Sequence, residues 1–304
     1  MLDKLYMLNF IYYIFIFIFI HLIVFSYGLQ FKKIFLHKIN VSIGEIGLLG
    51  FVSVYTLTTL IHFFSSITFN ISLFFYFFGS VFLWNNLKLL NQISYKEIKQ
   101  LAYIIIFTIF FSLTTSLHDD TYLYQLSTIN YLQQSKIIFG IQGIYDLLAY
   151  GHGFYNIMSI FQFPFLNNSS LFLVPIVFFN FFIFTCFLFF KENKNSVLNF
   201  FLIIIFLIFC FRYNRFSTFG ADIAPLSIIF LLQIYVIDFF KNKNFDNFEK
   251  FVIFLLFGIF LKLYVVSAFF LLFIFIFFLK KKIFFHFRKK KFENYDCYNA
   301  YWFI

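Results

Sequence analysis

Long apolar runs separated by short polar segments dominate the pattern of positions along the chain. A helix that crosses a membrane needs about 20 consecutive apolar residues, with a floor near 17. Seven runs come close to this length or reach it, and we interpret each as a membrane-spanning helix: residues 7–27, 43–64, 71–87, 101–117, 171–190, 197–211 and 223–240. The pattern therefore predicts an all-α, polytopic integral membrane protein.

Basic residues set the orientation of these spans. Five polar segments hold 18 of the 23 Lys and Arg residues: 31–41, 88–100, 191–196, 241–250 and 280–291. Cytoplasmic loops of membrane proteins carry an excess of Lys and Arg. We therefore assign all five segments to the cytoplasm, which places the N-terminus outside and the C-terminus inside.

An eighth apolar run, residues 251–279, does not fit a single crossing. As one helix it would be roughly 43 Å long at 1.5 Å per residue, which is too long for one span and slightly short for two. Both of its flanks are basic, so both lie on the cytoplasmic side. We therefore expect two short helices here, which brings the total to about nine spans.

The predicted spans divide the chain into four parts. Residues 1–117 form four N-terminal spans, residues 118–170 an outer-face loop, residues 171–291 about five further spans, and residues 292–304 a cytoplasmic tail that reads as truncated. The outer-face loop is far longer than a connection between neighbouring helices requires, and long loops are often functional.

Two short helices are expected within the outer-face loop. Tyr122, Leu126, Ile129 and Leu132 recur at near-helical spacing, which predicts a helix lying in the membrane interface. Tyr124 in the same segment suits the depth of the lipid headgroups. The apolar run 154–165 is too short to cross, so it dips into the membrane or lies flat on it.

Composition excludes a soluble protein. Hydrophobic residues make up 62% of the chain and charged residues 12%, with a mean hydropathy of +0.89. Soluble domains are about half apolar and about a quarter charged. The net charge of +10 follows from the basic cytoplasmic loops rather than from nucleic-acid binding, and the three Cys show no metal or disulfide spacing.

Asp119 and Asp120 are adjacent acids at the outer end of a predicted span. One interpretation is a helix cap, because Asp accepts hydrogen bonds from free backbone N–H groups. The other is a general base, or a ligand for a divalent cation such as Mg²⁺ or Mn²⁺ that binds phosphate. The local sequence leaves both open.

Lys262 falls 12 positions into the run 251–279. If a helix starts at Phe251, the Cα of Lys262 sits near mid-membrane, where a Lys costs about 3 kcal/mol. Snorkelling of the side chain to the interface is one explanation. We favour a functional cation facing a polar cavity, ready for a phosphate, because intramembrane charges usually mark sites.

Four further residues on the outer side are candidates for the same site. His152 lies between two glycines and can act directly or be structural. Arg212 and Arg215 are unusual in an outer loop, and bind a phosphate or pair with nearby acids. Asp222 precedes the span 223–240 and can also serve only as its cap.

Three stretches resemble segments of a large group of bacterial polytopic membrane proteins related to the GT-C glycosyltransferases. "DDTYLYQLSTINYLQQSKIIFGIQGIYDLLAYGHGFYNIMSIF" resembles an acidic D-x-x-x-Y-H-L start followed by a G-L-x-N-L-H-x-R-x-x-F-N loop. "FSTFGADIAPLSIIFLL" resembles an S-x-D-x-P span entry, and "FLKLYVVSAFFLLF" an I-K-L-S span. The chain departs from the pattern at Gln125, where the group often has His, and at Leu147, where it has Arg.

The resemblance implies a GT-C-like fold in a bacterial cytoplasmic membrane and transfer of a sugar from a polyprenyl-phosphate donor to a cell-envelope acceptor at the outer face. Membrane lipid and this lipid-linked sugar would be its partners. Asp119 or Asp120 would be the base, and six residues would bind substrate: Lys262, Arg212, Arg215, His152, Tyr124 and Asp222. A transporter or flippase for a lipid-linked or anionic substrate, or a non-catalytic membrane protein, are the alternatives.

Overall fold

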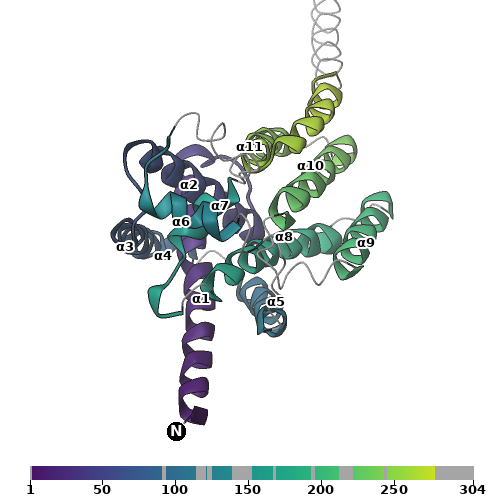
Figure 1. Ribbon diagram of the computed structural model, residues 1–304. Helices are drawn as coiled ribbons and strands as arrows, with labels where there is room; N and C mark the ends of the chain where they lie inside the picture. The colour runs from purple at the N-terminus through teal and green to yellow at the C-terminus, as the bar shows by residue number, and fades with distance from the viewer. Residues whose placement is uncertain are drawn as a thin grey trace, which may run out of the picture.

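The protein is a bundle of helices in a computed structural model (Figure 1). The structure describes residues 2–90, 94–113, 121, 125–138, 153–166, 169–192, 196–211, 222–242 and 245–277, and it holds no strand within these ranges. The helices in chain order are α1 (Leu2–Phe35), α2 (Ile43–Phe64), α3 (Phe69–Asn85), α4 (Leu87–Leu90), α5 (Tyr95–Leu113), α6 (Leu126–Gln134), α7 (Phe154–Ile160), η4 (Pro164–Leu166), η5 (Ser169–Phe172), α8 (Leu173–Glu192), α9 (Ser196–Phe211), α10 (Ile223–Asn242), α11 (Asp246–Leu261) and η7 (Leu263–Ala268). The all-α prediction is confirmed for this part of the chain.

Several of these helices are long and apolar enough to cross a membrane. Within the described ranges there are four: Phe10–Phe35, Ile43–Phe64, Ser170–Glu192 and Ile223–Asn242. Three shorter apolar helices accompany them: Phe69–Asn85, Ser196–Phe211 and Leu263–Phe277. The described part therefore has the helices expected of a polytopic membrane protein.

The run 251–279 divides into two helices, as its length predicts. The first, α11, begins at Asp246, five residues before the apolar run, because Asp246 and Glu249 suit the positive end of a helix. It ends at Leu261, where Lys262 adopts an extended backbone with φ −157° and ψ 132°. A short 3₁₀ segment then leads into a further helix over residues 269–277.

The contact between α1 and α2 is unusually close because glycines face backbone. A Cβ atom on Gly28 would overlap the carbonyl of Ile46, and one on Gly50 would overlap the carbonyl of Val24. On the neighbouring face of α2, Gly47 leaves room for the ring of Phe181 from α8. Small residues let helices in lipid approach closely, where van der Waals contact is a main source of association.

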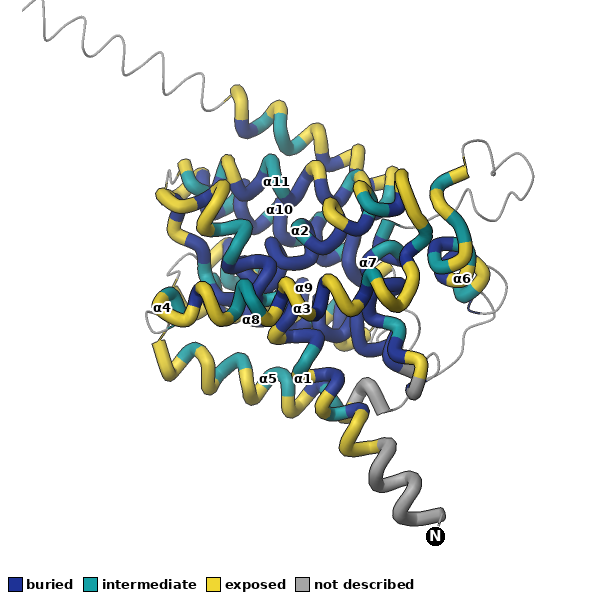
Figure 2. The backbone as a smooth tube through the Cα atoms, turned by 90° about the vertical axis from the view of Figure 1, so that its left-hand side faces the viewer, coloured by how far each residue is buried: buried dark blue, intermediate teal, exposed yellow. Residues whose placement is uncertain are grey.

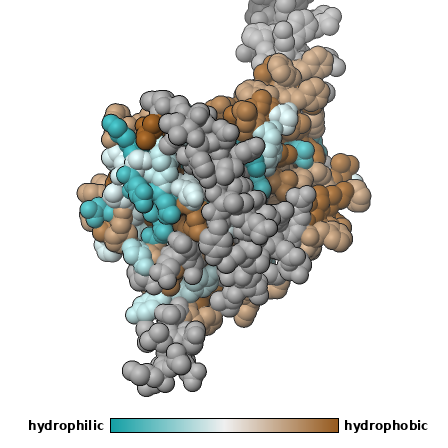
Figure 3. Space-filling model, in the orientation of Figure 1, coloured by the Kyte–Doolittle hydropathy of each residue, from teal (hydrophilic) through white to brown (hydrophobic). Residues whose placement is uncertain are grey.

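The bundle has two distinct ends, which Figure 2 shows at its left, beside α4, and at its right, beside α6. We call the second the α6 end. There, Ile137 N–H donates to the carbonyl of His62 in the last turn of α2 (3.1 Å), and Ile67 N–H, in the connection after α2, donates to the carbonyl of Leu132 in α6 (2.8 Å). Figure 3 looks onto this end and shows hydrophilic residues around α6, whereas the flank beside α9 is hydrophobic. We call the opposite end the α4 end.

The two short helices at the α6 end agree with the predicted stripe and with the short apolar run. Ile129 and Leu132, two members of the stripe, are buried on α6. Every residue of α7 except Asn156 is buried, and the carbonyl of Ile160 accepts a hydrogen bond from Tyr76 on α3. With seven residues α7 is too short to cross a membrane, as expected.

Candidate functional site

Two of the residues predicted to bind substrate meet at the α6 end. Lys262 follows the last residue of α11, and Asp222 precedes the first residue of α10. The ammonium nitrogen of Lys262 lies 2.5 Å from a carboxylate oxygen of Asp222, and their side chains are 35% and 66% exposed. The pair therefore lies partly exposed at the surface of the bundle and joins the ends of two neighbouring helices.

The helix geometry from which the sequence placed Lys262 near mid-membrane was wrong. It assumed a helix starting at Phe251 that continues through Lys262, but α11 starts at Asp246 and stops at Leu261. Because the backbone breaks at Lys262, the charge sits at a helix end, where a partly exposed ammonium has a carboxylate partner. The depth of Lys262 in the membrane therefore stays a prediction.

The end of the predicted outer-face loop reaches the same place. The N–H of Gly153 donates to the carbonyl of Leu261 over 3.1 Å, directly beside Lys262 in the chain. A Cβ on Gly153 would overlap the carbonyl of Phe260 and approach Cε2 of Tyr55 to 2.9 Å, so this contact requires glycine. Asn156 fixes the start of α7 to α2 through a hydrogen bond from its Nδ2 to Oγ1 of Thr59 (3.1 Å).

Six of the predicted site residues lie outside the described residues, namely Asp119, Asp120, Tyr124, His152, Arg212 and Arg215. The divalent-cation site predicted at Asp119 and Asp120 therefore stays a prediction. Across the ranges that the structure describes, no group of three or more His, Cys, Asp or Glu side chains could hold a metal ion.

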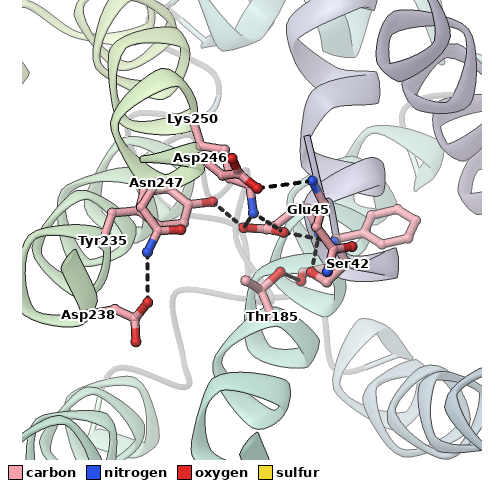
Figure 4. A network of polar contacts seen from close by, with 10 residues as sticks. Ser42, Glu45, Thr185, Tyr235, Asp238, Asp246, Asn247 and Lys250 are labelled. Atoms are coloured by element: carbon pink, nitrogen blue, oxygen red, sulfur yellow. Dashed lines mark hydrogen bonds and ion pairs between the residues drawn. The ribbon is translucent and has the colours of Figure 1, made fainter. Parts of the chain in front are cut away.

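A second cluster of charges lies at the α4 end, around Glu45 and Lys250 (Figure 4). The ammonium of Lys250 donates to both carboxylate oxygens of Glu45, each at 3.0 Å. Tyr235 O–H and Ser42 N–H also donate to this carboxylate, both at 2.8 Å. Glu45 and Lys250 are 2% and 5% exposed, so a complete ion pair is buried between α2 and α11.

Local sequence explains why Glu45 points here. Ser42 caps α2 by accepting the N–H of Glu45, while Glu45 accepts the N–H of Ser42, which is a reciprocal capping box. The box fixes the carboxylate at the first turn of α2. Lys250 lies in the first turns of α11, at the same end of the bundle, and its long side chain spans the distance between the helices.

Asp238 extends this network into the connection between α10 and α11. Its two carboxylate oxygens accept hydrogen bonds from Nδ2 of Asn242 and Nδ2 of Asn247, both at 2.7 Å. Asp238 and Asn247 are 5% and 2% exposed. The buried carboxylate is thus held in one orientation by two neutral amides.

A cavity of about 570 Å³ opens beside this network. Its polar lining residues are Lys32, Asn40, Ser42, Glu45, Glu97, Glu192, Asp238, Asn242, Asn247 and Lys250. These residues come from six helices and the connection between α1 and α2. A cavity of this size and polarity can hold a small polar molecule, since small-molecule sites typically measure about 300–1,000 Å³.

Reasoning from the sequence missed this second cluster. The pattern places Lys250 in a polar cytoplasmic segment and Glu45 and Asp238 within apolar spans, and it does not indicate that they meet. The Ser-x-x-Glu spacing at residues 42–45 and a carboxylate at position 238 within a predicted span were the available signals.

Comparison with known proteins gives a family but no named activity. No curated protein and no solved structure matches the chain. A protein-family profile, described as a domain of unknown function (DUF8201), matches residues 10–292, which include all of the described bundle except the first residues of α1. The chain belongs to this DUF8201 family.

Proposed function

We propose that the protein is a GT-C-like membrane glycosyltransferase that moves a sugar from a polyprenyl-phosphate donor to a cell-envelope acceptor. In this proposal it crosses a bacterial cytoplasmic membrane about nine times, with the α6 end outside. The alternation of basic segments and the resemblance of residues 119–273 to proteins of this type support it.

One observation carries the proposal. The ion pair of Lys262 and Asp222 lies beside the contact between Gly153 and Leu261, so α10, α11 and the end of the outer-face loop converge at one place. An enzyme that uses a lipid-linked donor needs such a meeting of a cation, a carboxylate and a loop at the membrane surface. The cation then binds the donor phosphate and the loop supplies the base.

The proposed reaction assigns separate tasks to these residues. The ammonium of Lys262, with Arg212 and Arg215, binds the donor phosphate, and Asp222 holds that ammonium in place before the donor arrives. Asp119 or Asp120 takes the proton from the acceptor hydroxyl as its oxygen bonds to the anomeric carbon. The bond from that carbon to the phosphate oxygen breaks, and the polyprenyl phosphate leaves with the electron pair.

Removing either proposed base, or the lysine proposed to bind the donor phosphate, should reduce sugar transfer. Either Asp119 or Asp120 is the base. Replacing that residue by Asn is expected to lower the rate of sugar transfer about 100-fold or more, because general-base catalysis contributes about 10²–10⁴-fold. Lys262→Ala should lower transfer with little loss of stability, since an exposed ion pair contributes about 1 kcal/mol at most. Membranes containing the full-length protein, supplied with radiolabelled undecaprenyl-phosphate-linked hexose, would measure transfer.

Lys33→Ala provides the matched control for Lys262→Ala, because Lys33 is an exposed lysine on α1 outside both clusters. It should leave transfer unchanged. Transfer at the unaltered rate in all three site variants would overturn the roles assigned above. Cysteine labelling near position 119 that succeeds only from the cytoplasmic side would overturn the orientation.

A further inference from the structure

A groove of about 590 Å³ runs along α8 and is lined by residues of α5, α8 and α9. Both α5 and α9 pack against α8. The lining residues of α8 extend from Ile176 to Phe190, a length of about 21 Å at 1.5 Å per residue. Because α8 is long and apolar enough to cross a membrane, this groove, here called the α8 groove, runs at the depth of the lipid tails.

The walls of the α8 groove suit a hydrocarbon chain. Phe107 of α5 and Phe206 of α9 line it and are 65% and 56% exposed, so the groove is open to the outside of the bundle. The hydroxyl of Thr108, a polar group in the wall, already donates to the carbonyl of Ile105 in its own helix (3.2 Å). Water in a cavity needs roughly two to four polar partners, so the groove favours lipid tails over water.

Two lysines stand at the α4 end of the groove. Lys99 precedes Tyr103 by one turn of α5, and its ammonium nitrogen lies 5.8 Å from the centroid of the Tyr103 ring, which lines the groove. Lys191 follows Phe187 by one turn of α8 and is adjacent to Phe190, and both phenylalanines line the groove. Both lysines are exposed, and neither forms an ion pair with a residue that the structure describes.

The acidic residues at these two helix ends line a different space. Glu97 of α5 and Glu192 of α8 both border the separate cavity beside Glu45 and Lys250, and neither lines the α8 groove. The α4 end of the groove is therefore bordered by two cations. Basic residues at such a place, next to an apolar wall, complement the anionic headgroup of a lipid.

We propose that the α8 groove binds one acyl chain of a phospholipid with an anionic headgroup, such as phosphatidylglycerol, and that Lys99 and Lys191 bind its phosphate. The hydrocarbon core of a bilayer is about 30 Å thick and one leaflet about half of that, so the groove is long enough for a whole acyl chain. The headgroup lies at the opposite end of the bundle from Lys262 and Asp222. This inference rests on the placement of the bundle in a membrane and not on sugar transfer.

Photocrosslinking of the purified full-length protein tests the proposal. Phosphatidylglycerol and phosphatidylcholine that each carry a diazirine in one acyl chain would be added separately, at equal mole fraction, to the protein in micelles of a neutral detergent. Mass spectrometry of the crosslinked peptides should place phosphatidylglycerol on α8 and α9, at least about fivefold more than phosphatidylcholine, because one lysine near an anionic headgroup contributes about this factor. Equal labelling by the two lipids, or labelling away from the groove, would overturn the proposal.

Variants of the two lysines test the headgroup contact. Lys99→Gln and Lys191→Gln should each lower labelling by phosphatidylglycerol about fivefold and leave labelling by phosphatidylcholine unchanged. Lys33→Gln is the control, because Lys33 is an exposed lysine in the last turn of α1 that does not line the groove. Unchanged labelling by phosphatidylglycerol in both groove variants would overturn the proposal.

A matched pair of variants on α9 tests the position of the acyl chain. Ile203 and Leu207 are both 48% exposed, but only Ile203 lines the groove. Ile203→Trp should fill part of the groove and lower labelling of α8, whereas Leu207→Trp should leave it unchanged. Equal labelling of α8 in the two variants would contradict the binding of the chain in this groove.

Competition separates the phospholipid from other occupants. Unlabelled phosphatidylglycerol should displace the phosphatidylglycerol probe. If undecaprenyl phosphate displaces the probe more strongly, the groove takes the sugar donor and the proposal is overturned. Crosslinks between two copies of the chain through α9, with loss of lipid labelling, would overturn it in favour of a dimer contact. Labelling is measured without sugar transfer, so failure of one proposal leaves the other standing.

Discussion

Lys250→Met is expected to destabilise the protein by about 3–5 kcal/mol. The substitution keeps a long, flexible side chain but removes the ammonium that contacts both oxygens of Glu45. The carboxylate would then be left charged at 2% exposure, with only Tyr235 and Ser42 as donors. Breaking a buried ion pair from one side has a cost of this size because it strands an uncompensated charge.

The double variant Glu45→Gln/Lys250→Met tests this explanation. Since it removes both charges, it should recover most of the lost stability, and buried pairs replaced by neutral residues are often tolerated. Glu249→Gln, at an exposed position one residue earlier, should have little effect. Unfolding midpoints and the folded yield in detergent measure all three. A double variant as unstable as Lys250→Met would mean that packing, and not charge, is responsible.

Gly50→Ala is expected to cost about 3 kcal/mol or more, at the upper end of the range for overpacked cores. In most helices Ala stabilises relative to Gly by about 1 kcal/mol. Here the added methyl group would overlap the carbonyl of Val24, and backbone cannot move aside as the tip of a side chain can. The crossing of α1 and α2 would have to open.

Gly79→Ala is the control for this effect, because it is the same substitution on another buried helix face. The new methyl group would meet Cδ1 of Ile23 at 2.9 Å and Cγ2 of the same residue at 3.0 Å, and both are side-chain atoms rather than backbone. We expect a clearly smaller loss of stability than for Gly50→Ala. Equal unfolding midpoints for the two variants in detergent would contradict the role given to the close approach of α1 and α2.

The apolar pattern predicted the helices better than it predicted what the charges do. Residues 43–64 form α2 with the expected bounds, because a capping serine and a polar segment limit that run on either side. The break within residues 251–279 also follows from length and flanking charge. The start of α11 at Asp246 does not follow from the sequence pattern, because acidic residues at such positions are equally typical of a loop.

The Lys262 pair and the Glu45 network differ in how far the sequence could have revealed them. Lys262 stood out as a lone charge in an apolar run, but its carboxylate partner lies 40 positions away and depends on how α10 and α11 pack. Glu45 and Lys250 are 205 positions apart, and each looks ordinary near the end of a span. Pairings of this kind arise only when the helices assemble.

The glycines at the crossing of α1 and α2 restrict how members of this family can vary. Because the positions of Gly28 and Gly50 face opposing backbone, a larger residue at either one would require the two helices to move apart along their whole length. That movement would also displace Glu45 at one end of α2 and the attachment of α6 at the other. Chains of the same family should therefore keep glycine at both positions even where the surrounding phenylalanines are exchanged for other apolar residues.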